Sequence, residues 1–512
     1  ECCGVSNFIK SNVASRFERL TDLINPSRNF CIRFNSKGES NVYINSTQFK
    51  ITIRSIIKMN RKVDNIIIGF GKAGKTLANY LGNKGEKTVL VEKSSNMYGG
   101  TCINVGCIPS KFLATCADRK AYSNADNKAY YKDSVVGKKN LIAKLNKANY
   151  DKVESNENVE VLDGTASFKD DHTIIVDNGS DSYEIFAEKI FINTGTRPFI
   201  PYVKGLEVGN RIHTSETLMN LEEFPETLAI LGSGFIGLEF AATYAKFGTK
   251  VTIIDKGDRL LPREDDDVAE VVYESYKSLG VDILFNSEID HVEQSDEKVF
   301  ISYTENGDIK ELKVDALLVA TGRRANALEL HLENAGVEVS ERGFINVNDH
   351  LQTNKPHIFA MGDINGGPQF TYVSLDDYRI VKSYLDGDGS YSRKDRQGIA
   401  FSAFLHPTFS KVGLGEKDAR EKGYNVKVST LPVTAIPKAK ILGNQTGVYK
   451  AVIDADTNQI LGAVLFGEES HEVINIVVAS MIAKQPYTVL ANQIFTHPTM
   501  AEALNDLFGS IK

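Results

Sequence analysis

Two cysteines, Cys102 and Cys107, are the only closely spaced pair after residue 62. The chain has 6 cysteines in 512 residues, too few for a disulfide framework. A structural zinc site would need two more ligands, and no second cysteine pair supplies them. The alternatives are two buried thiols or half of a metal site. Against these, the pair indicates redox chemistry without a metal, in a protein that we expect in the cytoplasm.

The pair lies in the segment GGTCINVGCIPSK, residues 99–111. Five residues of regular helix rise about 7.5 Å, which exceeds the roughly 4.4–6.8 Å between the Cα atoms of a disulfide. A bond between the two sulfurs therefore requires a distorted first turn, which Gly106 and Pro109 permit. A helix N-terminus would also lower a thiol pKa, and the thiolate is the reactive form.

A glycine loop of the form GxGxxG occurs twice, each time after an apolar strand and before a helix. The first glycine permits a tight turn, the second lets the backbone approach a pyrophosphate, and the third lets the helix pack on the strand. An acid follows each middle glycine by 21 residues and can bind the ribose hydroxyls of an adenine nucleotide. The copies are 163 residues apart, so they predict a duplicated unit that binds two different dinucleotides. The residues are Gly69, Gly71, Gly74 and Glu92 in the first copy, and Gly232, Gly234, Gly237 and Asp255 in the second.

The acid of the second copy, Asp255, favours NADH over NADPH because its charge would repel a 2′-phosphate. Lys256 and Arg259 follow closely and could offset that charge. The sequence therefore favours NADH and leaves NADPH open.

Around these loops the sequence has the pattern of an α/β protein. Two further apolar strands, at 183–192 and 314–320, each run into Thr-Gly. After about residue 398 the pattern changes and indicates a separate α+β domain. Its strands are expected at 426–431, 447–453 and 460–466, and its helices at 471–483, 487–494 and 500–508.

The charge of the chain is unevenly distributed. Residues 1–62 carry 11 Lys+Arg against 4 Asp+Glu, and the remainder carries 48 against 62. A body this acidic argues against a nucleic-acid partner, which needs a basic face. No apolar run reaches the roughly 18 residues of a membrane span. Residues 1–58 are expected to be an extension outside the functional fold, and the alternative is a basic targeting presequence.

These motifs resemble the pyridine nucleotide–disulfide oxidoreductases, flavoproteins that include glutathione reductase, dihydrolipoamide dehydrogenase and mercuric reductase. The resemblance covers about residues 62–512. It implies that Cys102 is the thiol that meets substrate. It also implies that Cys107 lies next to the flavin of FAD and forms a charge-transfer complex as a thiolate.

The resemblance implies three domains, two of them Rossmann-like and binding FAD and NAD(P)H. The third is a C-terminal α+β dimerisation domain. The expected divisions are 1–58 for the extension, 59–204 and 330–398 for the FAD domain, 205–329 for the NAD(P)H domain and 399–512 for dimerisation.

Further positions match the family one by one. Lys111 matches the lysine beside flavin N5, and Glu239 matches its ion-pair partner; the alternative is that both are ordinary surface residues. Phe235 falls where relatives shield the nicotinamide pocket, and Asp363 matches the acid that binds the ribityl chain of FAD. The remaining expected cofactor contacts are Lys93, Gly100, Thr101, Gly322 and Gly362.

His497, followed by Pro498 and by Glu502 five residues on, resembles the acid–base dyad of the family. In relatives the other subunit of a homodimer delivers this dyad. A histidine can deprotonate an attacking thiol, and a carboxylate fixes its tautomer. This chain has Phe495 and Thr496 where glutathione reductase and dihydrolipoamide dehydrogenase have a second histidine, which argues against an ordinary disulfide substrate.

Within the family, IPSK at 108–111 is shared with dihydrolipoamide dehydrogenase, and no C-terminal cysteine pair is present. The stretches GFGKAGKTLA, MYGGTCIN, QFTYVSLDDYRIV and PVTAIPKAKI resemble a mercuric-reductase-like branch, the bacterial reactive-chlorine-resistance flavoproteins. That branch implies reduction of a small oxidant, hypothiocyanous acid, with Cu(II) as another acceptor. The alternatives are dihydrolipoamide dehydrogenase, a mainly structural flavoprotein subunit of a larger assembly, and a cysteine-independent NADH oxidase or binding protein.

Overall fold

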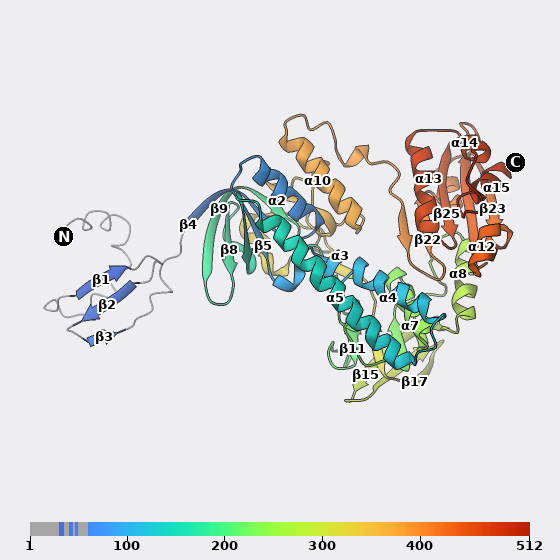
Figure 1. Cartoon of the computed structure of the whole chain (residues 1–512), viewed down its shortest axis with the longest axis horizontal. Coiled ribbons are helices and arrows are strands. Elements are labelled where there is room, and N and C mark those ends of the chain that lie inside the picture. Colours follow the sequence, from blue (N-terminus) through green and yellow to red (C-terminus); the bar gives the residue numbers. More distant parts are fainter. Residues whose placement is uncertain (1–29, 35–39, 45–46, 50–59, 512) are drawn as a thin grey trace.

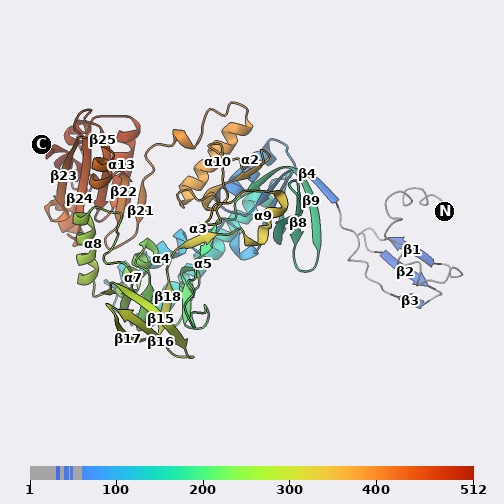
Figure 2. The same ribbon diagram turned by 180° about the vertical axis from the view of Figure 1, so that it is seen from behind.

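The structure is a computed structural model, which describes residues 30–34, 40–44, 47–49 and 60–511 (Figure 1). Strands β1 (Phe30–Phe34), β2 (Ser40–Ile44) and β3 (Thr47–Phe49) form an antiparallel sheet of their own. They pair with no other strand in the described part of the chain, and both views draw this sheet apart from the other sheets (Figures 1 and 2). The rest of the segment 1–58, including any targeting signal, lies outside the described residues.

The first large sheet has seven strands in the order β6-β5-β4-β9-β8-β7, with β20 on β9. Pairing among β6, β5, β4, β9 and β20 is parallel, and the middle of β4 and β5 is fully buried, as expected for a sheet covered on both faces. The strands are β4 (Asn60–Ile68), β5 (Thr88–Glu92), β6 (Val159–Asp163), β7 (Thr165–Phe168), β8 (Thr173–Asp177), β9 (Ser182–Ile192) and β20 (Ile358–Ala360). The helices beside it are α2 (Lys72–Asn83), α5 (Asn127–Glu154), α9 (Leu332–Ala335) and α10 (Thr371–Leu385).

Strand β4 begins earlier than the apolar pattern predicts. The continuous apolar run of this strand begins only at Ile66, but the strand extends back to Asn60. Residues 60–63, of which three are polar, pair with Glu184–Ala187 of β9. A partner strand, rather than local hydrophobicity, therefore sets this boundary.

The second large sheet repeats the strand–loop–helix unit. Its five strands run parallel in the order β11-β18-β12-β13-β14. They are β11 (Ile212–Thr214), β12 (Thr227–Leu231), β13 (Lys250–Ile254), β14 (Asp282–Leu284) and β18 (Ala316–Val319), with helices α6 (Ser215–Leu218), α7 (Phe235–Phe247) and α8 (Asp266–Ser278). An antiparallel sheet accompanies it, formed by β15 (Ser287–Gln294), β16 (Val299–Glu305) and β17 (Asp308–Val314). Strands β10 (Thr196–Pro198) and β19 (Arg323–Ala325) form a two-stranded antiparallel sheet. In the sequence, β10 precedes the second large sheet and β19 follows it.

The C-terminal domain is an antiparallel sheet in the order β21-β22-β25-β24-β23, with helices beside it (Figure 2). Its strands are β21 (Phe401–Ala403), β22 (Phe409–Gly413), β23 (Val426–Pro432), β24 (Val448–Asp454) and β25 (Ile460–Phe466). Its helices are α11 (Glu416–Glu421), α12 (Pro437–Leu442), α13 (Ser470–Ile482), α14 (Thr488–Asn492) and α15 (Ala503–Gly509). The α+β pattern predicted after residue 398 agrees with this arrangement.

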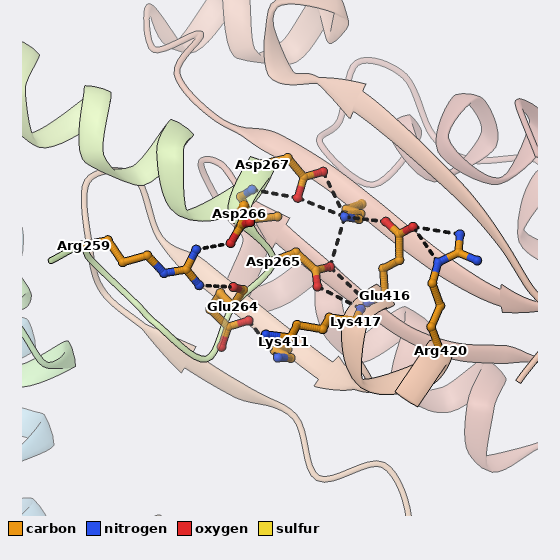
Figure 3. A network of polar contacts seen from close by, with 11 residues as sticks. Arg259, Glu264, Asp265, Asp266, Asp267, Lys411, Glu416, Lys417 and Arg420 are labelled. Carbon is orange, nitrogen blue, oxygen red and sulfur yellow. Dashed lines mark hydrogen bonds and ion pairs between the residues drawn. The ribbon is translucent and has the colours of Figure 1, made fainter. Parts of the chain in front are cut away.

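A charged network joins this domain to the start of α8 (Figure 3). The Lys450 side chain is only 3% exposed, and its Nζ lies 3.0 Å from Asp265, 2.9 Å from Asp267 and 3.0 Å from Glu416. Beside it, Lys411 Nζ lies 2.7 Å from Glu264, with both side chains nearly buried. The nucleotide-binding unit and the C-terminal domain therefore meet through desolvated charge pairs.

In the described part of the chain, no helix combines the length and the apolar character needed to cross a membrane.

Candidate active site

The cysteine pair lies across a broken helix. Helix α3 (Thr101–Asn104) holds Cys102, and helix α4 (Cys107–Lys120) begins at the second cysteine. Between them Gly106 has φ −130° and ψ −115°, and a Cβ atom there would lie 2.9 Å from the Thr101 carbonyl oxygen. The structure thus has the distorted turn that the five-residue spacing predicts, and a glycine fills its tightest point.

The two thiols shift each other's pKa in opposite directions. Donation from Cys107 lowers the pKa of Cys102 to about 6 against the opposing effect of burial, and Thr371, Lys75 and Lys111 lower it further. The same contact raises the pKa of Cys107. The hydroxyl of Thr371 lies 3.8 Å from the Cys107 sulfur. The lowered pKa of Cys102 favours a thiolate at this sulfur near neutral pH.

Lys111 and Glu239 form the ion pair that the resemblance implies. Lys111 Nζ lies 2.6 Å from Glu239 Oε2, and the two side chains are 29% and 15% exposed. The other carboxylate oxygen accepts a hydrogen bond from the Phe404 backbone at 2.8 Å, and Lys111 Nζ lies 4.8 Å from the Phe404 ring centre. The lysine is therefore fixed from two sides, one turn after Cys107.

A cavity of about 1290 Å³ extends along the first sheet and reaches both cysteines. The expected site residues that line it are Gly69, Gly71, Glu92, Lys93, Gly100, Thr101, Cys102, Cys107, Lys111, Phe235, Glu239 and Asp363. It has the size and length for a dinucleotide. Gly74, Gly322 and Gly362 do not line this cavity.

The residues of the cavity fit an FAD molecule. A Cβ atom at Gly69 would lie 2.4 Å from the Asn193 carbonyl, so only glycine leaves the turn open beside a pyrophosphate. The Thr194 hydroxyl lines the cavity, is buried and has no hydrogen-bond partner among the described residues. A polar ligand would satisfy this group, because buried polar atoms are normally paired.

The two predicted acids occupy equivalent places. Glu92 accepts hydrogen bonds from the backbone N–H of Phe70 at 2.9 Å and of Ser94 at 3.3 Å. Asp255 accepts the equivalent pair, from Ser233 at 2.6 Å and from Gly257 at 2.7 Å. Burial raises the pKa of Glu92. The duplication therefore extends from the sequence to the hydrogen bonds that hold each acid at its loop.

The glycines of the second loop follow the first. Gly232 has φ +104°, and a Cβ atom at Gly237 would lie 2.1 Å from the Gly232 carbonyl oxygen. Gly234 caps the start of α7 and has open space in front of it, as an approaching phosphate requires. Gly322, with φ +117°, follows the end of β18.

The turn after β20 places Asp363 at the cavity. Gly362 has φ +75° and donates its N–H to buried Asp377 at 2.5 Å. Asp363 accepts a hydrogen bond from Thr196 at 3.3 Å, and burial raises its pKa. Its carboxyl group is positioned to receive a hydroxyl-rich part of a ligand.

His497 and Glu502 also form the predicted dyad, with His497 Nδ1 2.7 Å from Glu502 Oε2. Burial opposes ionisation of Glu502, but hydrogen bonds from His497 and from the Thr499 backbone hold its pKa below the usual value. His497 is 68% exposed, and neither dyad residue lines the cavity that holds the cysteines. Within one chain the dyad and the cysteine pair are not brought together.

One group of metal-ligating side chains occurs in the described residues, formed by Asp171, His172 and His357. The two rings stack with centres 3.9 Å apart and planes 7° apart. Each ring already bonds a backbone carbonyl, of Ala187 and of Asp171 respectively. The lone pairs of stacked rings lie in two nearly parallel planes, so they do not converge on one ion in this arrangement.

Three further residues contribute to the site, although no motif near them in the sequence marks them as site residues. Thr371 reaches Cys107 from α10, and Phe404 braces Glu239 from the C-terminal domain. Asn193 accepts a hydrogen bond from the Gly74 N–H at 2.9 Å and donates one to the Met361 carbonyl at 2.6 Å, which ties the first loop to the Asp363 turn.

The chain matches the family model of the pyridine nucleotide-disulphide oxidoreductases over residues 63–377 and the dimerisation domain of that family over residues 399–508. It belongs to this family and is a flavin-dependent oxidoreductase with a dimerisation domain. Among characterised sequences it is similar to the probable pyridine nucleotide-disulfide oxidoreductase RclA of Escherichia coli, at 44% identity over 88% of this chain and 100% of that one. A mercuric reductase of Lysinibacillus sphaericus is 34% identical, covering 86% and 81% of the two chains. A dihydrolipoyl dehydrogenase of Haloferax volcanii is 31% identical, covering 86% and 94%.

The fold is that of solved relatives. The Cu(II) complex of the HOCl-induced flavoprotein disulfide reductase RclA from E. coli has a TM-score of 0.84 at 44% identity, covering 89% of this chain and 100% of that chain. A second structure, of the HOCl-induced flavoprotein disulfide reductase RclA from E. coli, has a TM-score of 0.82 and covers 88% of this chain.

Proposed function

We propose that this enzyme takes electrons from NADH or NADPH and passes them through FAD to the Cys102–Cys107 disulfide. The resulting dithiol then reduces a small oxidant, hypothiocyanous acid. The observation that carries the proposal is the pair of thiols on the two sides of the helix break, both of which line the cavity that fits FAD. The similarity to a relative described as an HOCl-induced disulfide reductase supports an oxidant over a large disulfide.

The thiol chemistry runs in two displacements. The Cys102 thiolate attacks the electrophilic sulfur of hypothiocyanous acid, forming a sulfur–sulfur bond and releasing hydroxide, which a proton converts to water. Cys107, after losing its proton, attacks the Cys102 sulfur, forms the disulfide and expels thiocyanate. In sum, one oxidant and two thiols give one disulfide, thiocyanate, water and a proton. Fast closure of the disulfide also protects Cys102 from irreversible oxidation.

FAD, when bound, supplies the transfer of two electrons from the nicotinamide to the disulfide. The glycines of the first loop, Glu92 and Asp363 would hold it, and Phe235 would cover the nicotinamide pocket. Lys111, fixed by Glu239 and lining the cavity one turn after Cys107, would bring a positive charge to the flavin side of the pair. Cys107 would be the flavin-proximal sulfur, and in the reduced enzyme it would become the thiolate when its proton passes to Cys102.

NADH is the proposed electron donor. Lys256 is paired with Glu288, and Arg259 with Asp266, so both cations near Asp255 already have partners. Exposed pairs of this kind contribute little stability, so a 2′-phosphate could still recruit either residue. The comparison of kcat/KM for NADH and NADPH tests this, and a preference for NADPH would contradict it.

A homodimer completes the proposed site. The His497–Glu502 dyad is exposed and does not line the cavity of its own chain, which fits delivery to a second copy. There His497 would take the proton from the thiol that attacks. We also propose a cytoplasmic location, because a reducing compartment keeps such a thiol pair cycling.

The test is NADH oxidation by the purified enzyme with hypothiocyanous acid, Cu(II) and lipoamide in parallel. We expect a far higher kcat/KM with hypothiocyanous acid than with lipoamide, and loss of that activity in Cys102→Ser. If dihydrolipoamide with NAD⁺ is the better pair, the enzyme is a dihydrolipoamide dehydrogenase. If Cu(II) reduction survives in both Cys102→Ser and Cys107→Ser, copper takes electrons without the thiols.

A further inference from the structure

One ammonium group that acts electrostatically on Cys102 has no carboxylate partner among the residues that the structure describes. Lys75 is half-buried on the first turn of α2, and its Nζ donates a hydrogen bond to the Asn149 side-chain carbonyl. The amide of Asn149 is oriented by its own donation to the Leu145 carbonyl at 2.7 Å. Among the described residues, no ion pair joins Lys75 to an acid.

The partner of this lysine, Asn149, packs against the segment that precedes Cys102. Asn149 packs on the loop before α3, since a Cβ atom at Gly99 would lie 3.3 Å from its side-chain carbon. Gly100 touches the start of α2, since a Cβ atom there would lie 2.7 Å from the Gly71 Cα. The ammonium of Lys75 is thus tied to the segment that leads directly into Cys102.

The two groups interact electrostatically. The charge of Lys75 is among those that lower the pKa of Cys102. Burial and the neighbouring charge of Lys72 lower the pKa of Lys75 to about 8, and the Cys102 thiolate opposes that fall. The Lys75 ammonium and the Cys102 thiolate therefore each favour the charged form of the other.

A half-buried ammonium without a carboxylate is costly to a fold, and such groups concentrate at functional sites. Its neighbouring cations, Lys72 and Lys152, make the local field more positive. Lys72 also lines the cavity that reaches the cysteines. The group that benefits from this field is an anion at Cys102.

We infer that Lys75, held by Asn149, is a positioning residue that stabilises the Cys102 thiolate and draws anionic groups to its sulfur. The inference deepens the proposed function and rests on it for the identity of the anion. In the second displacement, thiocyanate leaves the Cys102 sulfur with the electron pair of the broken sulfur–sulfur bond. The ammonium of Lys75 would stabilise that charge as it develops.

The experiment measures Cys102 alone, without any oxidant. In the flavin-loaded Cys107→Ser enzyme, the rate of Cys102 alkylation is followed against pH with neutral iodoacetamide and anionic iodoacetate, and the modified peptide is identified by mass spectrometry. Lys75 is then changed to Met, to Gln, which can still bond Asn149, and to Arg, which keeps the charge. Lys152→Met is the matched control, because it removes a nearby cation that does not act on Cys102 directly.

We expect Lys75→Met and Lys75→Gln to raise the apparent pKa of Cys102 and to lower its alkylation rate about threefold to tenfold at a pH below that pKa, where a shift of one pKa unit changes the thiolate fraction about tenfold. The preference for iodoacetate over iodoacetamide should fall by a similar factor. Lys75→Arg should restore both, and Lys152→Met should change neither.

Unchanged pH profiles and probe ratios in Lys75→Gln, with flavin retained, would overturn the inference. A change in Cys102 alkylation that occurs in Lys75→Met but not in Lys75→Gln would also overturn it. The hydrogen bond to Asn149, rather than the charge of Lys75, would then be responsible. If the alkylation results hold but hypothiocyanous acid is not reduced, the proposed substrate is wrong and the role of Lys75 stands. If hypothiocyanous acid is reduced but Cys102 alkylation is the same in all Lys75 variants, only the inferred role of Lys75 is wrong.

Discussion

Replacing Lys450 by methionine tests the charged network between α8 and the C-terminal domain. The substitution removes a 3%-exposed ammonium and leaves Asp265, itself 9% exposed, without its cation. Breaking a buried ion pair costs about 3–5 kcal/mol. Asp267 and Glu416 are 53% and 30% exposed and regain water, and Asp265 keeps two backbone donors. We therefore expect a loss at the low end, about 3 kcal/mol.

The assay is thermal unfolding of the purified flavin-loaded enzyme, followed by circular dichroism. About 3 kcal/mol corresponds to a fall of roughly 6–12 °C in the midpoint of a unit of 150–250 residues. Adding Asp265→Asn to Lys450→Met should recover part of the loss, because it removes the uncompensated carboxylate. As a control, Lys147→Met breaks an exposed pair with Asp151 and should leave the midpoint nearly unchanged.

The difference in the free energy of unfolding between Lys450→Met and the natural chain depends on pH through the pKa shifts of Asp265 and Lys450. Burial opposes both charges, but backbone donors and Lys450 lower the pKa of Asp265, and the three carboxylates raise that of Lys450. Asp265 contributes its full share to the stability of the folded protein above about pH 4. This contribution is lost as the pH falls through the lower pKa of Asp265 in the folded state. The contribution of Lys450 is full below about pH 10 and is lost as the pH rises through its higher folded pKa. A single variant that melts within 1 °C of the natural chain, or a double variant less stable than the single, would refute this reasoning.

Three further predictions concern the site. Two-electron reduction should produce a long-wavelength charge-transfer band that Cys107→Ser abolishes and Cys102→Ser keeps, as absorbance spectra will show; the reverse result would exchange the two roles. Mixed dimers of inactive Cys102→Ser and His497→Ala chains should regain part of the activity, and verified heterodimers without activity would exclude delivery in trans. Deleting residues 1–58 should leave flavin content and kcat nearly unchanged, because every site residue follows Met59 and β4 begins at Asn60; loss of flavin would place the segment within the fold.

Much of the site could be predicted because its chemistry is encoded in short motifs. The two glycine loops, their acids and the broken helix of the cysteine pair are each set by a few neighbouring residues. The contacts of Lys111 with Glu239 and of His497 with Glu502 were also expected, although the first joins residues 128 apart. Resemblance to a family, rather than local pattern, supplied that long-range pairing.

What could not be predicted depends on tertiary packing. Lys75 and Asn149 lie on different helices, and nothing near either residue indicates the other. Thr371 and Phe404 reach the site from segments more than 100 residues away from the groups they contact. The early start of β4 follows from pairing with β9. In each case the determining partner is distant in sequence, so a reading of local composition and periodicity does not reveal it.

The contact between Gly71 and Gly100 has a consequence for how this enzyme can change over time. The loop at the phosphate site and the segment before Cys102 touch backbone to backbone, and Gly100 adopts φ +77°, which side chains rarely tolerate. A side chain at Gly100 would push the redox-active segment and the phosphate loop apart together. The two motifs therefore form one structural unit, so a substitution in either motif must also fit the backbone of the other.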